Sequence, residues 1–371
     1  MAVAPAASRG AAGRPERLVV LDGIRGWAAL QVVVFHMLRE CFSRLLPELH
    51  TRPVLLLLDG SIAVYTFFVL SGCALSYGYV VRRDTMVVRS LAVKRYLRLA
   101  IPIAISSAFT LALVLAGLTA NRAAGVIVHR EDWLGSFLSD PVSIGHSLWF
   151  VAVEVFSFAP IQGSLNPFLW TMSIEMFGAF VVFFVLLVGH GAGLVARMAL
   201  LALSAVVILL IDERAIGFPV GVVLAEMIAA GWFAALRGRP AWSWPIAAAG
   251  LLVAEETMRH TSGPVASTWA ALCLLVAVLS NAVLFEFFAS RVSQWLGSIS
   301  FPLYLGQFAV LVTVTSRMIV LWVDPAAPGH VVPYAIAAAS VLGSITLAVG
   351  LRWAEQRAAW VNVALARVLL R

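Results

Sequence analysis

The first apolar stretch of the chain contains an arginine and a histidine, two residue types that take part in catalysis, at a spacing that would place them on one face of a helix. Arg25 lies at the start of the apolar stretch 24–42, and His36 follows eleven residues later, towards the middle or outer half of that stretch. Eleven residues make about three turns of α-helix, so both side chains share one face, about 16 Å apart along the axis. A neutral imidazole can take a proton from a hydroxyl near neutral pH. His36 is therefore a candidate general base, and the alternative role is a hydrogen bond between helices.

Acidic side chains also interrupt apolar stretches. Glu175 follows Trp170 by five residues in the segment WTMSIE (170–175), and Glu154 follows Trp149 at the same spacing. A carboxylate inside hydrocarbon needs a cation, a hydroxyl or its own proton as a partner. We expect Glu175 to orient the candidate base or to bind substrate hydroxyls, with Glu154 as its rival. Glu226 is a third buried acid, either neutral or paired within the bundle.

A serine and two arginines could handle a second substrate. Ser71 ends the segment FFVLS (67–71) before Gly72, where small residues either line a substrate or let two helices approach closely. No G-x-S-x-G elbow surrounds it, so it is not a predicted nucleophile. Arg95 and Arg98 are three residues apart and share a helix face, so they could clamp a phosphate-bearing group. Alternatively they fix the orientation of the chain and touch anionic lipid headgroups.

The elements that position these residues must cross a membrane. The chain has 371 residues, of which 61% are hydrophobic and 12% charged, too few polar groups to coat a water-soluble globule. Continuously apolar runs long enough for helices, rather than barrel strands, predict an all-α polytopic protein with about ten spans. We place these spans at 24–42, 61–81, 97–118, 168–188, 192–211, 216–236, 241–254, 264–289, 300–323 and 331–351.

The basic residues predict orientation and domain limits. Arginines precede the first span and crowd the second connection, so both termini should be cytoplasmic and the location a cytoplasmic cell membrane. We expect a disordered basic arm at 1–17, one membrane domain at 18–355 and a basic tail at 356–371. The semi-apolar piece 147–160 is too short to span. The expected partners are the lipid bilayer and the substrates of the protein rather than nucleic acid.

The three cysteines, Cys41, Cys73 and Cys273, are far apart and show no C-x-x-C spacing. We expect them to be small buried residues, without a disulfide framework or a thiolate metal site. No metal and no tightly bound cofactor are predicted.

Taken in order, several segments resemble the acyltransferase-3 family of integral membrane acyltransferases. They are LDGIRG (21–26) with His36, FFVLSG (67–72), KRYLRLAIP (94–102), LWTMSIE (169–175) and ISFPLYL (299–305). The resemblance implies a ten-helix fold that moves an acyl group, commonly acetyl, from cytoplasmic acyl-coenzyme A to a hydroxyl, typically on a surface or exported glycan. It also implies that His36 is the catalytic histidine, that Arg25 is its partner, and that Arg95 and Arg98 bind the donor.

The chain departs from the family pattern in two respects. Many relatives have a histidine after the Tyr-Leu pair, where this chain has Gln307, so a second histidine role is not expected there. Because the chain ends soon after the last predicted span, we expect no counterpart of the hydrolase-like domain that some longer relatives carry. We therefore expect acceptor handling by the membrane domain or a separate partner.

Residue chemistry and resemblance together predict a membrane O-acyltransferase. His36 would deprotonate the acceptor hydroxyl for direct attack on the thioester, while Arg25 orients groups or stabilises developing negative charge. Arg95, Arg98 and Ser71 would serve the donor, although a covalent acyl-enzyme through Ser71 is an open alternative. The expected acceptor is a carbohydrate of exopolysaccharide, O-antigen or lipo-oligosaccharide, or a small glycosylated metabolite such as a macrolide. The residues expected to support the acceptor are Asp22, Trp170, Ser173 and Tyr304.

A different class would be a proton-coupled transporter, with His36, Arg25, Glu175 and Glu226 as a relay. It predicts inverted repeats, and the two halves of the sequence show no convincing similarity. A third interpretation, a sensor or scaffold protein that catalyses no reaction, would leave the presence of Arg25 and His36 in one apolar stretch unexplained.

Overall fold

The structure, a computed structural model, describes residues 16–50, 58–140, 143–157, 164–324 and 329–369, and these contain helices and no strand. The predicted arm at 1–17 thus lies almost wholly outside the described residues. The helices are α1 (Glu16–Val34), η1 (Phe35–Glu40), η2 (Pro47–His50), α3 (Gly60–Arg82), α4 (Thr85–Leu115), α5 (Asn121–Ile127), α6 (Ile144–Ala152), η3 (Glu154–Phe156), η4 (Pro167–Trp170), α7 (Thr171–Val188), α8 (Leu194–Ile211), η5 (Glu213–Ile216), α9 (Gly217–Ala229), α10 (Trp232–Arg237), α11 (Pro240–His260), α12 (Pro264–Ser280), α13 (Ala282–Ala289), α14 (Arg291–Val310), η6 (Leu311–Thr315), α15 (Ser316–Trp322) and α16 (Val331–Leu369).

The helices fit a polytopic membrane protein. Among the described residues, seven are long and apolar enough to cross a bilayer, or eight if the bent pair α12 and α13 is one span. Each of the ten predicted ranges overlaps a helix, but the exact number of crossings and the side of the termini stay predictions. Residues 147–156 of the piece predicted at 147–160 lie in a short apolar helix (Ile144–Phe156), which is too short to span, and residues 158–160 lie outside the described residues. Where a basic tail was predicted at 356–371, α16 continues through residue 369.

Two predicted spans are broken for local reasons. Gly231 takes the left-handed conformation with φ at +82° and separates α9 from α10, so the run 216–236 is not one straight helix. Backbone of this kind is readily adopted by glycine. At Asn281 the chain bends by 96° between α12 and α13. The Asn281 side chain accepts hydrogen bonds from the amides of Val283 and Leu284, which caps the new helix.

The chain forms two compact units, each made from separate stretches. The first contains residues 1–28, 61–88 and 178–298, and the second contains 29–60, 89–177 and 299–371. Helices α1, α4, α7 and α14 each contribute residues to both units, and of α3 only Gly60 falls in the second unit.

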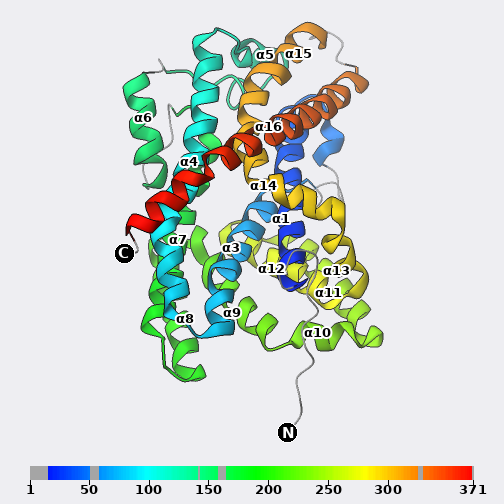
Figure 1. Cartoon of the computed structure of the whole chain (residues 1–371). Coiled ribbons are helices and arrows are strands. Elements are labelled where there is room, and N and C mark those ends of the chain that lie inside the picture. Colours follow the sequence, from blue (N-terminus) through cyan, green and yellow to red (C-terminus); the bar gives the residue numbers. More distant parts are fainter. Residues whose placement is uncertain (1–15, 51–57, 141–142, 158–163, 325–328, 370–371) are drawn as a thin grey trace. The chain divides into compact units, whose positions relative to one another are not determined.

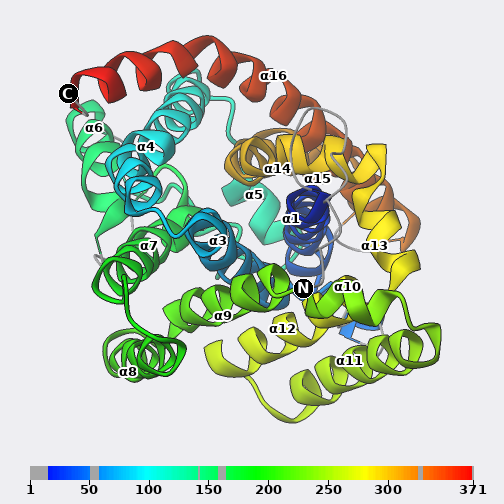
Figure 2. The same cartoon turned by 60° about the horizontal axis from the view of Figure 1, so that its bottom comes forward.

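In the first unit, α3 packs closely on α9, and the two lie side by side (Figure 1). A Cβ built on Gly72 would lie 2.2 Å from the Phe218 carbonyl oxygen, and one on Gly221 would lie 2.2 Å from the Val69 oxygen. Small residues at both positions thus let the helix backbones touch. Val20, Leu70 and Leu224 belong to the buried core beside this crossing. Helices α11 and α12 form a neighbouring hairpin (Figure 2).

In the second unit, α4, α6, α7 and α14 surround a core that includes Ile103, Phe150, Leu169 and Leu305. Two π-helical segments belong to this unit, η1 and η6, and in it α5 also lies beside α15 (Figure 1). The Thr315 hydroxyl, at the end of η6, is 3.5 Å from the Met37 sulfur in η1. Single π turns inside α-helices occur frequently at functional sites.

Candidate functional site

His36 lies in the π-helical segment η1, and its side chain is half-buried. Its Nδ1 is 3.0 Å from the side-chain oxygen Oε1 of Gln307. Gln307 is fully buried in α14, and its Nε2 donates a hydrogen bond to the backbone oxygen of Tyr304 at 3.2 Å. The two residues are 271 positions apart, so no local pattern in the sequence indicated this pair. The signal that could have found it is the family position at which Gln307 replaces histidine.

Aromatic rings fix the plane of the His36 imidazole. The Phe168 ring stacks on it with centroids 4.0 Å apart and planes 9° apart, and Trp133 lies 6.0 Å away. Phe168 is positioned by the short helix η4, where the Asn166 side chain accepts a hydrogen bond from the Phe168 amide at 3.1 Å. One face of the His36 ring is therefore packed against the nearly parallel ring of Phe168.

Tyr304 joins the elements around this ring. Its hydroxyl donates a hydrogen bond to the Phe168 carbonyl. Because a phenol has one proton to give, the Thr171 hydroxyl, 2.7 Å away, is the donor in the second contact. The Tyr304 backbone oxygen meanwhile accepts from Gln307. One residue thus anchors both the stacked Phe168 and the amide facing His36.

Arg130 secures the C-terminal end of η1. Its guanidinium donates to the Glu40 backbone oxygen, to the Glu40 carboxylate at 3.1 Å and to the Ser43 hydroxyl at 2.6 Å. The same guanidinium lies 5.2 Å from the centre of the Trp133 ring. Neither Arg130 nor Trp133 was among the predicted site residues.

Glu175 forms a buried ion pair with Arg95 in the same unit. The Nη2 atom of Arg95 is 2.5 Å from the Glu175 carboxylate and 3.2 Å from the Glu175 backbone oxygen. Arg95 Nε is buried without a hydrogen-bond partner. The structure thus brings together a predicted donor-binding residue, Arg95, and a predicted catalytic acid, Glu175, whereas the side chain that contacts Nδ1 of His36 is Gln307.

The remaining predicted residues of this unit differ in burial and in their hydrogen-bond partners. Arg98 is exposed on α4. Ser173 is buried, and its hydroxyl donates to the Trp170 backbone oxygen at 3.1 Å. Glu154, the rival acid, is 3.0 Å from Nε2 of the half-exposed His146. The two Trp-to-Glu segments therefore place their carboxylates beside different partners.

In the first unit, Arg25 is paired locally. Its Nη1 lies 3.3 Å from the Asp22 carboxylate, one turn earlier in α1. Gly72 makes the close contact with α9 described above, which supports the packing role for that small-residue pair, while Ser71 is half-buried. Arg25 and His36 fall in different units, so their predicted partnership stays a prediction.

Glu226 has the partners that the sequence did not reveal. Its carboxylate is 3.1 Å from Nη2 of Arg83 and 3.3 Å from Nη1 of Arg197. Glu226 is therefore paired with two guanidinium groups within the first unit rather than isolated.

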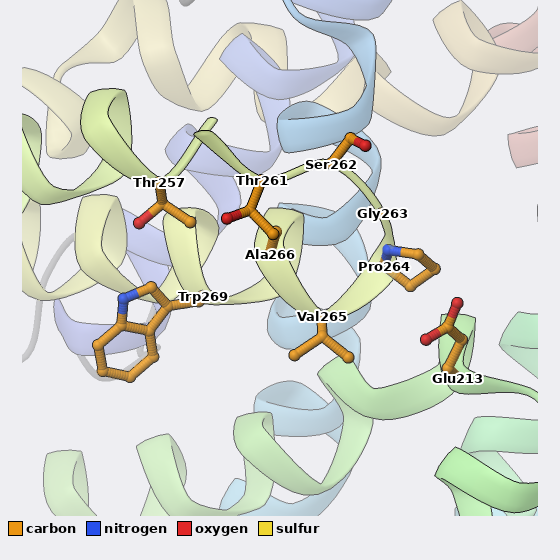
Figure 3. Close-up of a pocket in the computed structure, with 9 residues that line it drawn as sticks. All are labelled: Glu213, Thr257, Thr261, Ser262, Gly263, Pro264, Val265, Ala266 and Trp269. Carbon is orange, nitrogen blue, oxygen red and sulfur yellow. The ribbon is translucent and has the colours of Figure 1, made fainter. Parts of the chain in front are cut away.

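A cavity of about 310 Å³ opens in the first unit where η5, the end of α11 and the start of α12 meet, with Trp269 and Glu213 at opposite ends (Figure 3). No predicted site residue lines it. The lining residues are Glu213, Thr257, Thr261, Ser262, Gly263, Pro264, Val265, Ala266 and Trp269. Within the described part of the chain, no group of three or more His, Cys, Asp or Glu side chains is placed to hold a metal ion.

Comparison with known proteins gives one family. The family model of acyltransferase 3, described as an acyltransferase domain, matches residues 18–353, nearly the whole chain. No curated protein and no solved structure gives a significant match.

Proposed function

The chain belongs to the acyltransferase-3 family, and from this premise we propose that it moves an acyl group, acetyl in the first instance, from cytoplasmic acyl-coenzyme A to a carbohydrate hydroxyl. Family membership and the apolar helices together make it a membrane acyltransferase. The proposed acceptors are exopolysaccharide, O-antigen or lipo-oligosaccharide in the cell envelope. The proposed location is the cytoplasmic membrane.

The observation that carries the mechanism is the setting of His36. Its imidazole is half-buried, stacked on Phe168 and hydrogen-bonded through Nδ1 alone. Within the described residues Nε2 has no hydrogen-bond partner, so that nitrogen is available to a substrate. A general base must reach the proton that it abstracts, and a half-buried ring with one nitrogen that makes no hydrogen bond to any described residue supports this role for His36.

In the proposed reaction, the acceptor hydroxyl gives its proton to His36 and its oxygen attacks the thioester carbon. A carbon–oxygen bond forms and the carbon–sulfur bond breaks. The coenzyme A thiolate leaves and recovers the proton from the imidazolium, so the products are an ester and free coenzyme A thiol. Direct transfer of this kind needs no acyl-enzyme. In the alternative through Ser71, that hydroxyl would first carry the acyl group.

The basic segment of α4 supports the donor side of the proposal. Coenzyme A is polyanionic, and guanidinium groups bind phosphate with charge-assisted hydrogen bonds. Arg98 is exposed and Arg95 keeps its Nε without a partner. We assign Arg98 to the phosphates and Arg95, held by Glu175, to a more deeply placed part of the donor.

Two further interpretations follow from the same residues. A small glycosylated metabolite such as a macrolide would present the same hydroxyl chemistry as a glycan. A proton-coupled transporter would use ionisable residues as a relay, but the family match favours the acyltransferase. In the first unit, moreover, Glu226 is already shared by Arg83 and Arg197.

The test uses the full chain in proteoliposomes supplied with radiolabelled acetyl-coenzyme A. Exopolysaccharide, an O-antigen fraction and a macrolide glycoside serve as acceptors in parallel. We expect base-labile label on one acceptor and release of free thiol, and a loss of about 10²- to 10⁴-fold in folded His36→Gln. Solute uptake without label transfer would identify a transporter, and normal transfer by His36→Gln would overturn the mechanism.

A further inference from the structure

We infer that Gln307 is a positioning residue that holds His36 in the tautomer with the proton on Nδ1, so that Nε2 is the nitrogen that acts as the base. This inference deepens the proposed function and rests on it for the role of Nε2. The state of the His36 ring itself can be measured without any substrate.

The first step is the orientation of the Gln307 amide. Its two ends differ only in oxygen and nitrogen, and their assignment depends on what surrounds them. One end faces the Tyr304 backbone oxygen at 3.2 Å, and a carbonyl oxygen can only accept a hydrogen bond. The NH₂ group must therefore point to Tyr304. The amide oxygen then points to His36, and the full burial of Gln307 leaves no water to satisfy a reversed amide.

The second step is the tautomer. The amide oxygen of Gln307 lies 3.0 Å from Nδ1 and needs a donor there. A neutral imidazole carries one N–H, so a proton on Nδ1 leaves a lone pair on Nε2. The other tautomer would place the Nδ1 lone pair against the oxygen lone pairs of the amide. That arrangement leaves a buried acceptor without its hydrogen bond, which disfavours this tautomer.

The third step is rigidity. The ring cannot turn over freely to exchange its nitrogens, because Phe168 stacks on it at 4.0 Å. Tyr304 ties the two restraints together, since its hydroxyl donates to the Phe168 carbonyl and its backbone oxygen accepts from Gln307. Contacts from Gln307 in α14 and Phe168 in η4 thus determine which nitrogen of His36 is left unprotonated. The Gln307 amide therefore acts by orienting the His36 imidazole and does not itself carry a proton.

Nitrogen-15 NMR of ring-labelled histidine in the reconstituted full chain reads the tautomer directly. The signal of His36 is assigned by its loss in His36→Gln. We expect a protonated Nδ1 and an unprotonated Nε2 in the wild type. Gln307→Met keeps the side-chain length but removes the amide, and should lose the preference. Gln307→Glu restores an oxygen toward Nδ1 and should keep that nitrogen protonated.

Kinetics supply the second readout. Gln307→Met should lower kcat by about 10- to 100-fold, less than the full contribution of a general base, and leave KM for acetyl-coenzyme A unchanged. Gln307→Glu should recover part of kcat. Ser344→Ala is the control, because it also removes a buried side-chain hydrogen bond in this unit, from Ser344 to the Ser340 carbonyl at 2.8 Å. Its NMR signals and kcat should match the wild type.

The inference is overturned if wild-type His36 carries its proton on Nε2, or if Gln307→Met keeps the wild-type tautomer and kcat. The first result is measured on the wild type alone, so it can refute the inference even if a variant misfolds. Failure of the proposed function looks different: no acyl transfer by the wild type, whatever its tautomer.

Discussion

The guanidinium of Arg95 donates from a single nitrogen, Nη2, to both the carboxylate and the backbone oxygen of Glu175, at 2.5 and 3.2 Å. Both side chains are only 11% exposed, and Arg95 Nε is buried without a partner. A buried charge is tolerated when it is paired, so each residue depends on the other. Glu175 therefore fixes a cation in the unit that also contains His36.

Breaking this ion pair on one side should destabilise the protein more than removing it altogether. Single variants Glu175→Gln and Arg95→Met should each lose roughly 3–5 kcal/mol, because one buried charge stays uncompensated. The double variant should lose much less than the sum. Thermal unfolding of the four proteins in one detergent checks this, and additive losses would show that the two charges do not depend on each other.

Removal of the exposed Arg98 should weaken donor binding. We expect Arg98→Gln to raise KM for acetyl-coenzyme A at least about tenfold with kcat preserved, since a charge-assisted hydrogen bond contributes about 1.5–3 kcal/mol. Arg89→Gln is the matched control, because Arg89 is an exposed arginine on the same helix. Equal effects of both variants would instead favour the topological role of the basic segment.

The two candidate acids should respond differently to neutralisation. Glu154 pairs with His146, whose side chain is 51% exposed, and such pairs contribute only about 0–1 kcal/mol. Glu154→Gln should therefore preserve transfer and stability within this range. Glu175→Gln should reduce transfer as well as stability. The opposite ranking in the labelled-acetyl assay would give Glu154 the functional role.

The crossing of α3 and α9 should not tolerate a side chain at its glycines. We expect Gly221→Ala to cost about 1–3 kcal/mol, because a Cβ there would lie 2.2 Å from the Val69 oxygen and the backbones must separate. A Cβ on Gly350, in α16, meets no atom within 4 Å. Gly350→Ala should accordingly be neutral or stabilise the helix by up to about 1 kcal/mol. Equal melting temperatures for the two variants would contradict the close crossing.

Much of the fold was predictable from the sequence, because helix formation in apolar surroundings depends on short runs of residues. All ten predicted ranges overlap helices, and the piece at 147–160 is too short to span. The breaks were less visible. Gly231, between α9 and α10, adopts the left-handed conformation, whereas the glycines inside the helices do not, and the 96° bend at Asn281 occurs in a continuously apolar run. Whether a glycine or asparagine ends a helix depends on packing as well as on residue type.

For the candidate site, too, the sequence predicted the local features and the tertiary structure determined the long-range contacts. The sequence by itself determined that the chain enters a membrane, that it belongs with the acyltransferases, and that a histidine and buried acids interrupt its apolar helices. Only the tertiary structure decided who their partners are: Gln307 for His36, Arg95 for Glu175, and Arg83 with Arg197 for Glu226. Hydropathy and spacing act over a few turns of one helix. A hydrogen bond between residues 271 positions apart exists only when separate helices have packed together.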